Sequence, residues 1–220
     1  MEDPIQRHPT RAEQLGILAN LIADTTADGD KVLDIGCGTG YAGHLVQALR
    51  PDLHFVGVDL SQSALDAAAQ NLSGFSHSPT LVQGDLMAHE GIEVPPGPYA
   101  GIWTALTFHD LTDDAKQAVI GWMARLLAPG GFVYIYDRIR LEQPALFPLQ
   151  RSVWSRIERE HGVAMRGADT FEAYAADLDK TNTPATLDDY FKWLPAAGLS
   201  AQLIHLHGNI MLMAGAPKPV

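Results

Sequence analysis

The stretch KVLDIGCGTG, residues 31–40, constrains the fold of this chain more than any other feature of its sequence. Its first half, VLDI, is a short apolar run of the kind found in strands that are buried on both faces. Glycines then follow at alternate positions, Gly36, Gly38 and Gly40. Because glycine takes positive φ and lets the backbone approach a ligand, such a turn presents N–H groups to a bound molecule. The stretch predicts an α/β fold with a ligand site at this turn.

The length and charge of the chain limit the classes of protein it can belong to. A chain of 220 residues suits one domain, so we expect residues 1–220 to fold as a single domain. A net charge of −11 disfavours a large nucleic-acid footprint. No apolar run has the length of a membrane span, and the N-terminus lacks a secretory pattern. With Cys37 as its only cysteine, the chain cannot form an internal disulfide, and we expect a cytoplasmic protein without a membrane partner.

Strand and helix patterns alternate along the first 137 residues. A capping-box spacing at Thr10 and Glu13 opens an amphipathic helix predicted over residues 10–27. After the opening strand, further strands are predicted at residues 54–58, 80–83, 100–106 and 132–136. The intervening helices are predicted at residues 41–49, at 61–72, and from Thr112 to the Pro-Gly-Gly run at 129–131. This alternation predicts a parallel sheet with helices on both faces.

The pattern changes after Asp137. Residues 138–198 show only helical periodicity, at 153–160, 171–178 and 187–197. We expect this segment to be a helical cover over the strand ends, inserted after the fifth strand. The tail then alternates as two strands, 201–207 and 210–214, joined through Gly208 and Asn209, which is a hairpin signal. The hairpin would add an antiparallel strand to one edge of the sheet.

Carboxylates stand at the ends of successive predicted strands, where open parallel sheets bind their ligands. They are Asp34, Asp59, Asp85 and Asp137. A carboxylate at the place of Asp59 can accept hydrogen bonds from both hydroxyls of a ribose. A pyrophosphate beside Asp34 would suffer like-charge repulsion, whereas an amino group would be stabilised there. The pattern favours a zwitterionic amino-acid group joined to a nucleoside.

These motifs resemble, in the same order, those of the class I (Rossmann-like) S-adenosylmethionine-dependent methyltransferase superfamily. VLDIGCGTG is similar to its first motif, VGVDLS (56–61) to its second and VQGDL (82–86) to its third. IWTALTFHDL (102–111) resembles the fourth, and LLAPGGFVYIYD (126–137) the turn and strand after it. The resemblance covers about residues 10–137. It implies a doubly wound, mostly parallel seven-stranded sheet in the order 3-2-1-4-5-7-6, with strand 7 antiparallel.

The same resemblance implies S-adenosylmethionine as the cofactor and S-adenosylhomocysteine as its product. It places Asp59 at the ribose, Asp85 at the adenine amino group and Leu86 against the adenine ring. The residues expected to bind the cofactor are Asp34, Gly36, Cys37, Gly38, Gly40, Asp59, Leu60, Asp85, Leu86 and Thr104. His109, just beyond the fourth strand, is the candidate base, with Asp110 beside it. A pocket-shaping role for His109 is the alternative.

The resulting functional hypothesis is in-line transfer of a methyl group to an O or N atom of a small-molecule acceptor. The alternatives are modification of tRNA or protein, cofactor binding without catalysis, and an NAD-dependent dehydrogenase. Methylation of nucleic-acid amino groups is disfavoured, because residues 104–107 lack the Asp- or Asn-Pro-Pro-aromatic motif of the family members that perform it. Asp137 and His109 do not form a metal-ligand set, so no metal is expected. The acceptor and the oligomeric state, a homodimer included, stay open.

Overall fold

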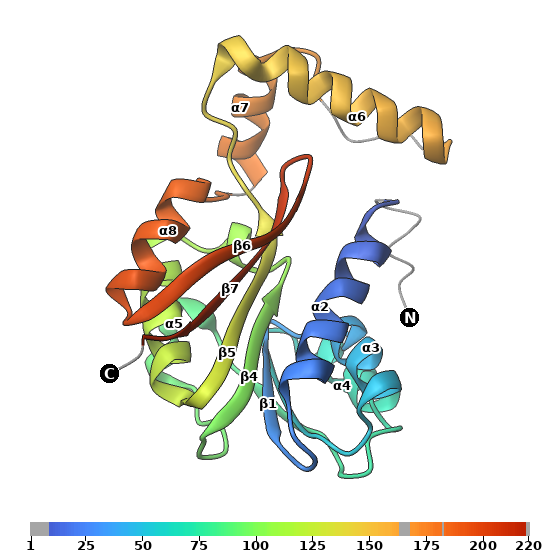
Figure 1. The fold of residues 1–220 in the computed structure, drawn as a ribbon, viewed down its shortest axis with the longest axis vertical. Helices are drawn as coiled ribbons and strands as arrows, with labels where there is room; N and C mark the ends of the chain where they lie inside the picture. The colour runs from blue at the N-terminus through green and yellow to red at the C-terminus, as the bar shows by residue number, and fades with distance from the viewer. Residues whose placement is uncertain (1–8, 163–167, 182, 219–220) are drawn as a thin grey trace.

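The computed structural model describes residues 9–162, 168–181 and 183–218, and its centre is a seven-stranded sheet. The strand order is β3-β2-β1-β4-β5-β7-β6 (Figure 1). The strands are β1 Lys31–Ile35, β2 His54–Asp59, β3 Thr80–Gln83, β4 Tyr99–Ala105, β5 Leu127–Arg138, β6 Leu199–His207 and β7 Ile210–Pro217. β7 pairs antiparallel with β5 and β6, and the other neighbouring strands pair in parallel. The predicted order and directions are confirmed.

Helices cover both faces of this sheet. The helices of the chain are α2 Arg11–Thr25, α3 Tyr41–Leu49, α4 Gln62–Asn71, α5 Asp113–Leu126, α6 Phe147–His161, α7 Phe171–Thr181 and α8 Leu187–Ala196, of which α6 and α7 do not pack on the sheet. Short 3-10 turns lie at η1 Leu86–Gly91, η2 Phe108–Asp110 and η3 Pro144–Leu146. In the part of the chain that the structure describes, no helix combines the length and the apolar character needed to span a bilayer.

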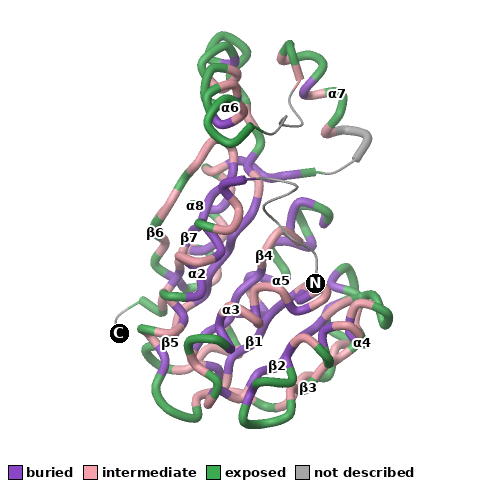
Figure 2. Tube along the Cα trace, turned by 90° about the vertical axis from the view of Figure 1, so that its right-hand side faces the viewer, coloured by how far each residue is buried: buried purple, intermediate pink, exposed green. Residues whose placement is uncertain are grey.

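The alternation of side chains along the strands divides the core into two layers. Val32 and Trp103 face α2, α3 and α4, whereas Leu33 and Ile102 face α5 and α8. Burial is concentrated along the strands and falls off on the outer helix faces (Figure 2). With both faces covered, the carboxyl edge of the parallel strands is the exposed end at which a ligand can meet the sheet.

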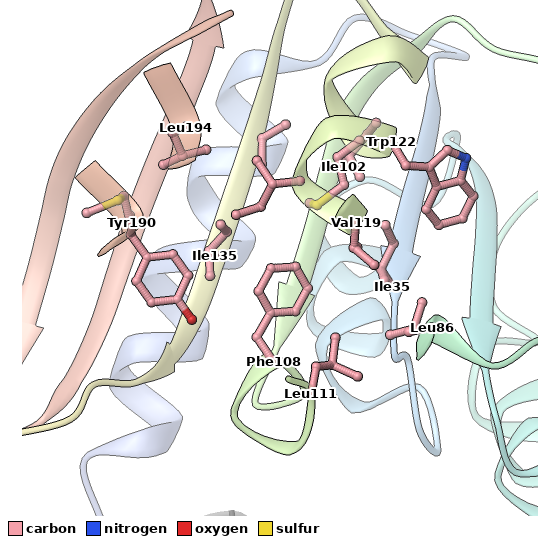
Figure 3. Packing of buried hydrophobic residues seen from close by; sticks show 14 of the residues in the cluster. Ile35, Leu86, Ile102, Phe108, Leu111, Val119, Trp122, Ile135, Tyr190 and Leu194 are labelled. Atoms are coloured by element: carbon pink, nitrogen blue, oxygen red, sulfur yellow. The ribbon is translucent and has the colours of Figure 1, made fainter. Parts of the chain in front are cut away.

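The predicted helical cover consists of α6 and α7 only. These two helices lie beyond the carboxyl edge of the sheet (Figure 1). They form a small apolar cluster of their own, built on Phe147, Trp154 and Tyr174. α8 forms near its expected bounds but packs on the sheet, where Tyr190 and Leu194 join the core beside Ile135 (Figure 3). The prediction that the third helix covers the strand ends is therefore wrong.

Two local predictions are also wrong. Thr10 makes no side-chain capping bond to α2, because its own backbone is helical at φ −83° and ψ −8°, whereas a capping residue needs extended geometry. The Pro-Gly-Gly run at residues 129–131 lies inside β5 instead of before it. Leu127 already pairs with Tyr99, and a register shift between Tyr99 and Gly101 absorbs the extra residues as a bulge.

The packing of α8 can be tested by truncating its buried apolar side chain. Leu194 is 0% exposed, so Leu194→Ala should lower the free energy of unfolding by about 2–5 kcal/mol, the cost of a core cavity. The control is Leu149→Ala on α6, at a side chain that is 66% exposed, with an expected change within about 0.5 kcal/mol. Urea denaturation measures both values. Equal costs for the two variants would contradict the packing of α8 on the sheet.

Candidate functional site

A cavity of about 520 Å³ opens at the carboxyl edge of the sheet. Most of the predicted cofactor residues line it, namely Asp34, Gly36, Cys37, Gly38, Asp59, Leu60, Asp85 and Leu86. Gly40, Thr104 and His109 are not among its lining residues, and no described residue of the 138–198 segment is. Thr104 is fully buried in β4, and its Oγ1 has no hydrogen-bond partner among the described residues. The cavity therefore belongs to the sheet edge and not to the helical cover.

The glycine turn after β1 is fixed to the neighbouring strands. The N–H groups of Gly36 and Cys37 both donate to the Val58 carbonyl, at 2.8 and 2.9 Å. Gly36 has φ +73°, and a Cβ there would lie 2.3 Å from the Thr107 side chain, so only glycine fits. Gly40, at φ +82°, starts α3 as its N-cap. A Cβ at Gly38 would meet no atom within 4 Å, which leaves open space in front of the turn.

Asp34 carries a buried carboxyl group at the wall of the cavity. The residue is 1% exposed, and neither carboxyl oxygen has a hydrogen-bond partner among the described residues. Burial raises the pKa of Asp34 to about 8, the nearby Trp103 indole offsets part of the rise, and the charge of Asp59 adds to it. A buried carboxyl without donors costs free energy. A ligand group with N–H donors would supply the hydrogen bonds that the Asp34 carboxyl lacks.

The next two strand-end acids are held by backbone N–H groups. Oδ2 of Asp59 accepts from Gly38 at 2.7 Å, and its Oδ1 accepts from Ser61 at 2.9 Å. Oδ1 of Asp85 accepts from Met87 at 2.8 Å and caps η1. Since β1, β2 and β3 are neighbours in the sheet, the three acids stand in a row along its edge. This row can bind successive polar parts of an extended ligand.

Cys37 lies in the same turn, but its thiol is unreactive. Burial raises the pKa of its thiol far above the usual range, and the charges of Asp34 and Asp59 add to this effect. The thiolate is the nucleophilic form of cysteine, so a thiol held protonated is a packing residue and not a nucleophile.

His109 lies in η2 and is paired with Asp137, at the end of β5. Its Nδ1 is 2.6 Å from Oδ1 of Asp137, and its backbone N–H donates to Oδ2 at 2.8 Å. The His109 side chain is only 9% exposed, whereas Asp110 and Thr107 beside it line the cavity. The structure thus brings Asp137 to His109, while the role of His109 as a base stays a prediction. No group of three His, Cys, Asp or Glu in the described ranges is placed to hold a metal ion.

Sequence reasoning missed two walls of the cavity. Arg11 and Leu15 line it from α2, and Leu106 and Thr107 line it from the end of β4. Leu106 has φ +57°, a backbone conformation that is uncommon for non-glycine residues and that clusters at functional sites. The fourth motif was a signal for the β4 wall, but the amphipathic pattern of α2 gives no sign that its first turn reaches a ligand.

Comparison with known proteins gives consistent matches. A family model described as a methyltransferase domain matches residues 32–131. Phosphoethanolamine N-methyltransferase 1 of Arabidopsis thaliana is 33% identical over 112 residues, or 51% of this chain and 22% of that protein. Trans-aconitate 2-methyltransferase of Methylobacterium nodulans is 28% identical over 183 residues, or 79% of this chain and 58% of that protein. This chain therefore matches less than two thirds of the length of either curated relative.

A solved structure extends the likeness over nearly the whole chain. The complex of DhpI with SAH aligns with a TM-score of 0.60 at 18% identity, and covers 96% of this chain and 88% of that chain. At this identity the similarity establishes a shared fold.

The close approach of Gly36 to Thr107 yields a test of the turn. Gly36→Ala should weaken the binding of S-adenosylhomocysteine by about tenfold or more, because the new Cβ displaces Thr107 and the turn. Gly29→Ala is the matched control, since Gly29 has φ +74° but open space around it. Both variants lose stability, but only Gly36→Ala should lose binding in isothermal titration. Normal binding by Gly36→Ala would contradict this geometry.

The burial of Asp34 yields a pH dependence. Its pKa rises from 3.8 to about 8 on folding, so the folded state holds an extra proton between these values and loses stability as the pH rises through them. Asp34→Asn removes this loss. Its stability relative to wild type should therefore increase by on the order of a few kcal/mol from pH 5 to pH 8 in urea denaturation. The matched control is Asp24→Asn, at an exposed position of α2. Identical pH profiles for the two variants would argue against the burial of Asp34.

Proposed function

Because this chain belongs to the class I S-adenosylmethionine-dependent methyltransferase superfamily, we propose that it methylates an O or N atom of a small-molecule acceptor. S-Adenosylhomocysteine is the co-product. The observation that carries the proposal is the buried Asp34 carboxyl, which lacks hydrogen-bond partners among the described residues and lines the cavity. Its two oxygens suit the amino group of the cofactor, whose positive charge would favour the ionised carboxylate, whereas a phosphate beside Asp34 would raise the pKa of this carboxyl further.

Each part of the cofactor has a matching set of residues along the sheet edge. We assign Asp34 and the turn of Gly36, Cys37, Gly38 and Gly40 to its amino-acid end. Asp59 and Leu60 are assigned to the ribose, and Asp85 with Leu86 to the adenine. Thr104 supports this wall from within β4, where it pairs in register with Ile35 of β1. When bound, the cofactor supplies a methyl group activated by a sulfonium.

The work left to the protein is to hold the acceptor in line with this methyl group and to exclude water. Leu106 and Leu111 provide apolar wall beside Asp110, at the part of the cavity nearest η2. His109 is the proposed base for acceptors that must lose a proton, and Asp137 holds its ring.

A small acceptor fits the charge of the chain better than a nucleic acid does. The net charge of −11 opposes binding to a phosphate backbone. The two relatives described above are named for phosphoethanolamine and for trans-aconitate, both of which are small molecules. Modification of tRNA or protein, and cofactor binding without catalysis, are the alternatives that the experiment separates.

The experiment is titration with S-adenosylhomocysteine and with NAD, followed by a release assay over phenols, amines, carboxylates and tRNA. Asp59→Ala should weaken S-adenosylhomocysteine binding by about 100-fold, because the ribose and the Gly38 N–H both lose a charged acceptor. Asp66→Asn, at an exposed position of α4, is the matched control and should bind as wild type does. If wild type binds NAD and not S-adenosylhomocysteine, the proposal fails. Binding without turnover favours the non-catalytic alternative.

A further inference from the structure

The part of the cavity nearest η2 has a wall formed by residues 106–111, which we call the β4 turn. Leu106, Asp110 and Leu111 of this turn line the cavity. The φ of Leu106 is +57°, and a non-glycine residue keeps such a backbone only where its surroundings hold it in place. The side chains of Phe108 and Leu111 pack in the core (Figure 3). The bonds at the two ends of the turn therefore set the shape of this wall.

A buried lysine holds the end of the β4 turn. Lys116, in α5, has a side chain that is 0% exposed. Its Nζ donates to the Leu111 carbonyl at 2.8 Å, to the Thr183 carbonyl at 2.6 Å and to Oδ1 of Asp113 at 2.7 Å. An ammonium group has three N–H donors, so these three acceptors satisfy it completely. Without them, a charged group would be unstable at this depth.

Thr183 lies between α7 and α8 and binds the same turn directly. Its N–H donates to the His109 carbonyl at 2.7 Å, and its Oγ1 donates to the Leu111 carbonyl at 2.8 Å. The Leu111 carbonyl thus accepts hydrogen bonds from both Thr183 and Lys116. We call the bonds that these two residues make with the β4 turn the Lys116 clamp. The clamp joins the cavity wall to the chain that returns from α7.

The same returning chain forms the base of the helical cover. Arg140, which precedes α6, donates from its backbone N–H to the Ala185 carbonyl at 2.8 Å and from Nε to the Pro184 carbonyl at 3.1 Å. The chain that enters the cover is therefore bonded to the chain that leaves it. No described residue of α6 or α7 lines the cavity, but the cover is attached to the cavity wall through Thr183.

The cofactor side of the cavity is held by other bonds. The Gly36 N–H donates to the Val58 carbonyl, and Asp59 accepts from the Gly38 N–H. Thr107, near the start of the β4 turn, donates to the Gly36 carbonyl at 3.2 Å. The start of the turn thus belongs to the cofactor side, whereas its end depends on the Lys116 clamp. A change in the clamp displaces the end of the turn and leaves the cofactor residues in place.

Resting on the proposed function, we propose that Lys116 and Thr183 are positioning residues for the methyl acceptor. They act through Asp110 and Leu111, which line the cavity at the end of the β4 turn. In-line transfer depends on the placement of the acceptor to within a fraction of an ångström, and this wall provides that placement. Because Thr183 also carries the base of the cover, a displacement of α7 reaches the acceptor through the same bonds.

The kinetic test uses the compound that wild type methylates fastest in a panel of phenols, amines, carboxylates and tRNA. Lys116→Met should lower kcat/KM for this acceptor by about 100-fold, because a shift of the turn by about 1 Å misaligns the acceptor. Rates are divided by the concentration of S-adenosylhomocysteine sites, so unfolded protein does not count, and the affinity for S-adenosylhomocysteine should stay unchanged. The control is Lys192→Met on α8, at a side chain that is 72% exposed, and it should behave as wild type.

A matched pair at Thr183 tests the clamp without removing a buried charge. Thr183→Val loses the hydroxyl that donates to the Leu111 carbonyl and should lower kcat/KM for the acceptor by about fivefold to tenfold. Thr183→Ser keeps this hydroxyl and should behave as wild type. If Lys116→Met does not fold, the pair decides alone, and equal kcat/KM in its two members overturns the proposal.

Amide hydrogen exchange needs no acceptor. In Lys116→Met, or in Thr183→Val, the amides of residues 109–111 should exchange at least about tenfold faster than in wild type, and those of residues 36–38 at the wild-type rate. Wild-type exchange at residues 109–111 overturns the clamp. Equal losses of acceptor kcat/KM and of S-adenosylhomocysteine affinity also overturn it, because they indicate general loosening. A wild type that does not bind S-adenosylhomocysteine, or binds it without turnover, contradicts the proposed function instead.

Discussion

The desolvation of one carboxyl group governs the ligand site of this protein. Asp34 lies near the end of a strand that is covered on both faces, so water cannot solvate an ionised carboxylate there, and neither of its oxygens has a hydrogen-bond partner among the described residues. The N–H groups of Gly36, Cys37 and Gly38 in the turn beside it already donate to the Val58 carbonyl and to Asp59. Such a wall binds a group that brings its own N–H donors, and a positively charged group there would favour the ionised form of the carboxyl.

The strand order and the acids at the strand ends could be predicted because their signals are local in the sequence. Buried parallel strands are continuous apolar runs, and each acid lies within two residues of the end of its strand. The Gly208-Asn209 turn likewise predicts the antiparallel hairpin of β6 and β7. A ligand site at the edge of a parallel sheet follows from these features without knowledge of how the helices pack.

The remaining parts depend on tertiary packing, which periodicity does not resolve. The apolar face of α8 fits the sheet as well as it fits a cover, and the pairing of His109 with Asp137 joins residues 28 positions apart. The prediction of a capping box at the start of α2 failed for a related reason. The spacing at Thr10 failed because the backbone of Thr10 itself is already helical, whereas Thr186 and Asp189 form a complete capping box at the start of α8. Sequence spacing permits a cap, but the backbone decides whether it forms.

Cys37 makes the glycine turn observable in a further way. It is the only thiol in the chain, it is 7% exposed, and burial holds its pKa far above the usual range. A maleimide should therefore label Cys37 slowly, and faster when the turn opens. The labelling rate rises with the frequency of these openings. A ligand that occupies the turn slows the reaction by the fraction of protein to which it is bound. The labelling rate of Cys37 therefore reports how often the glycine turn opens.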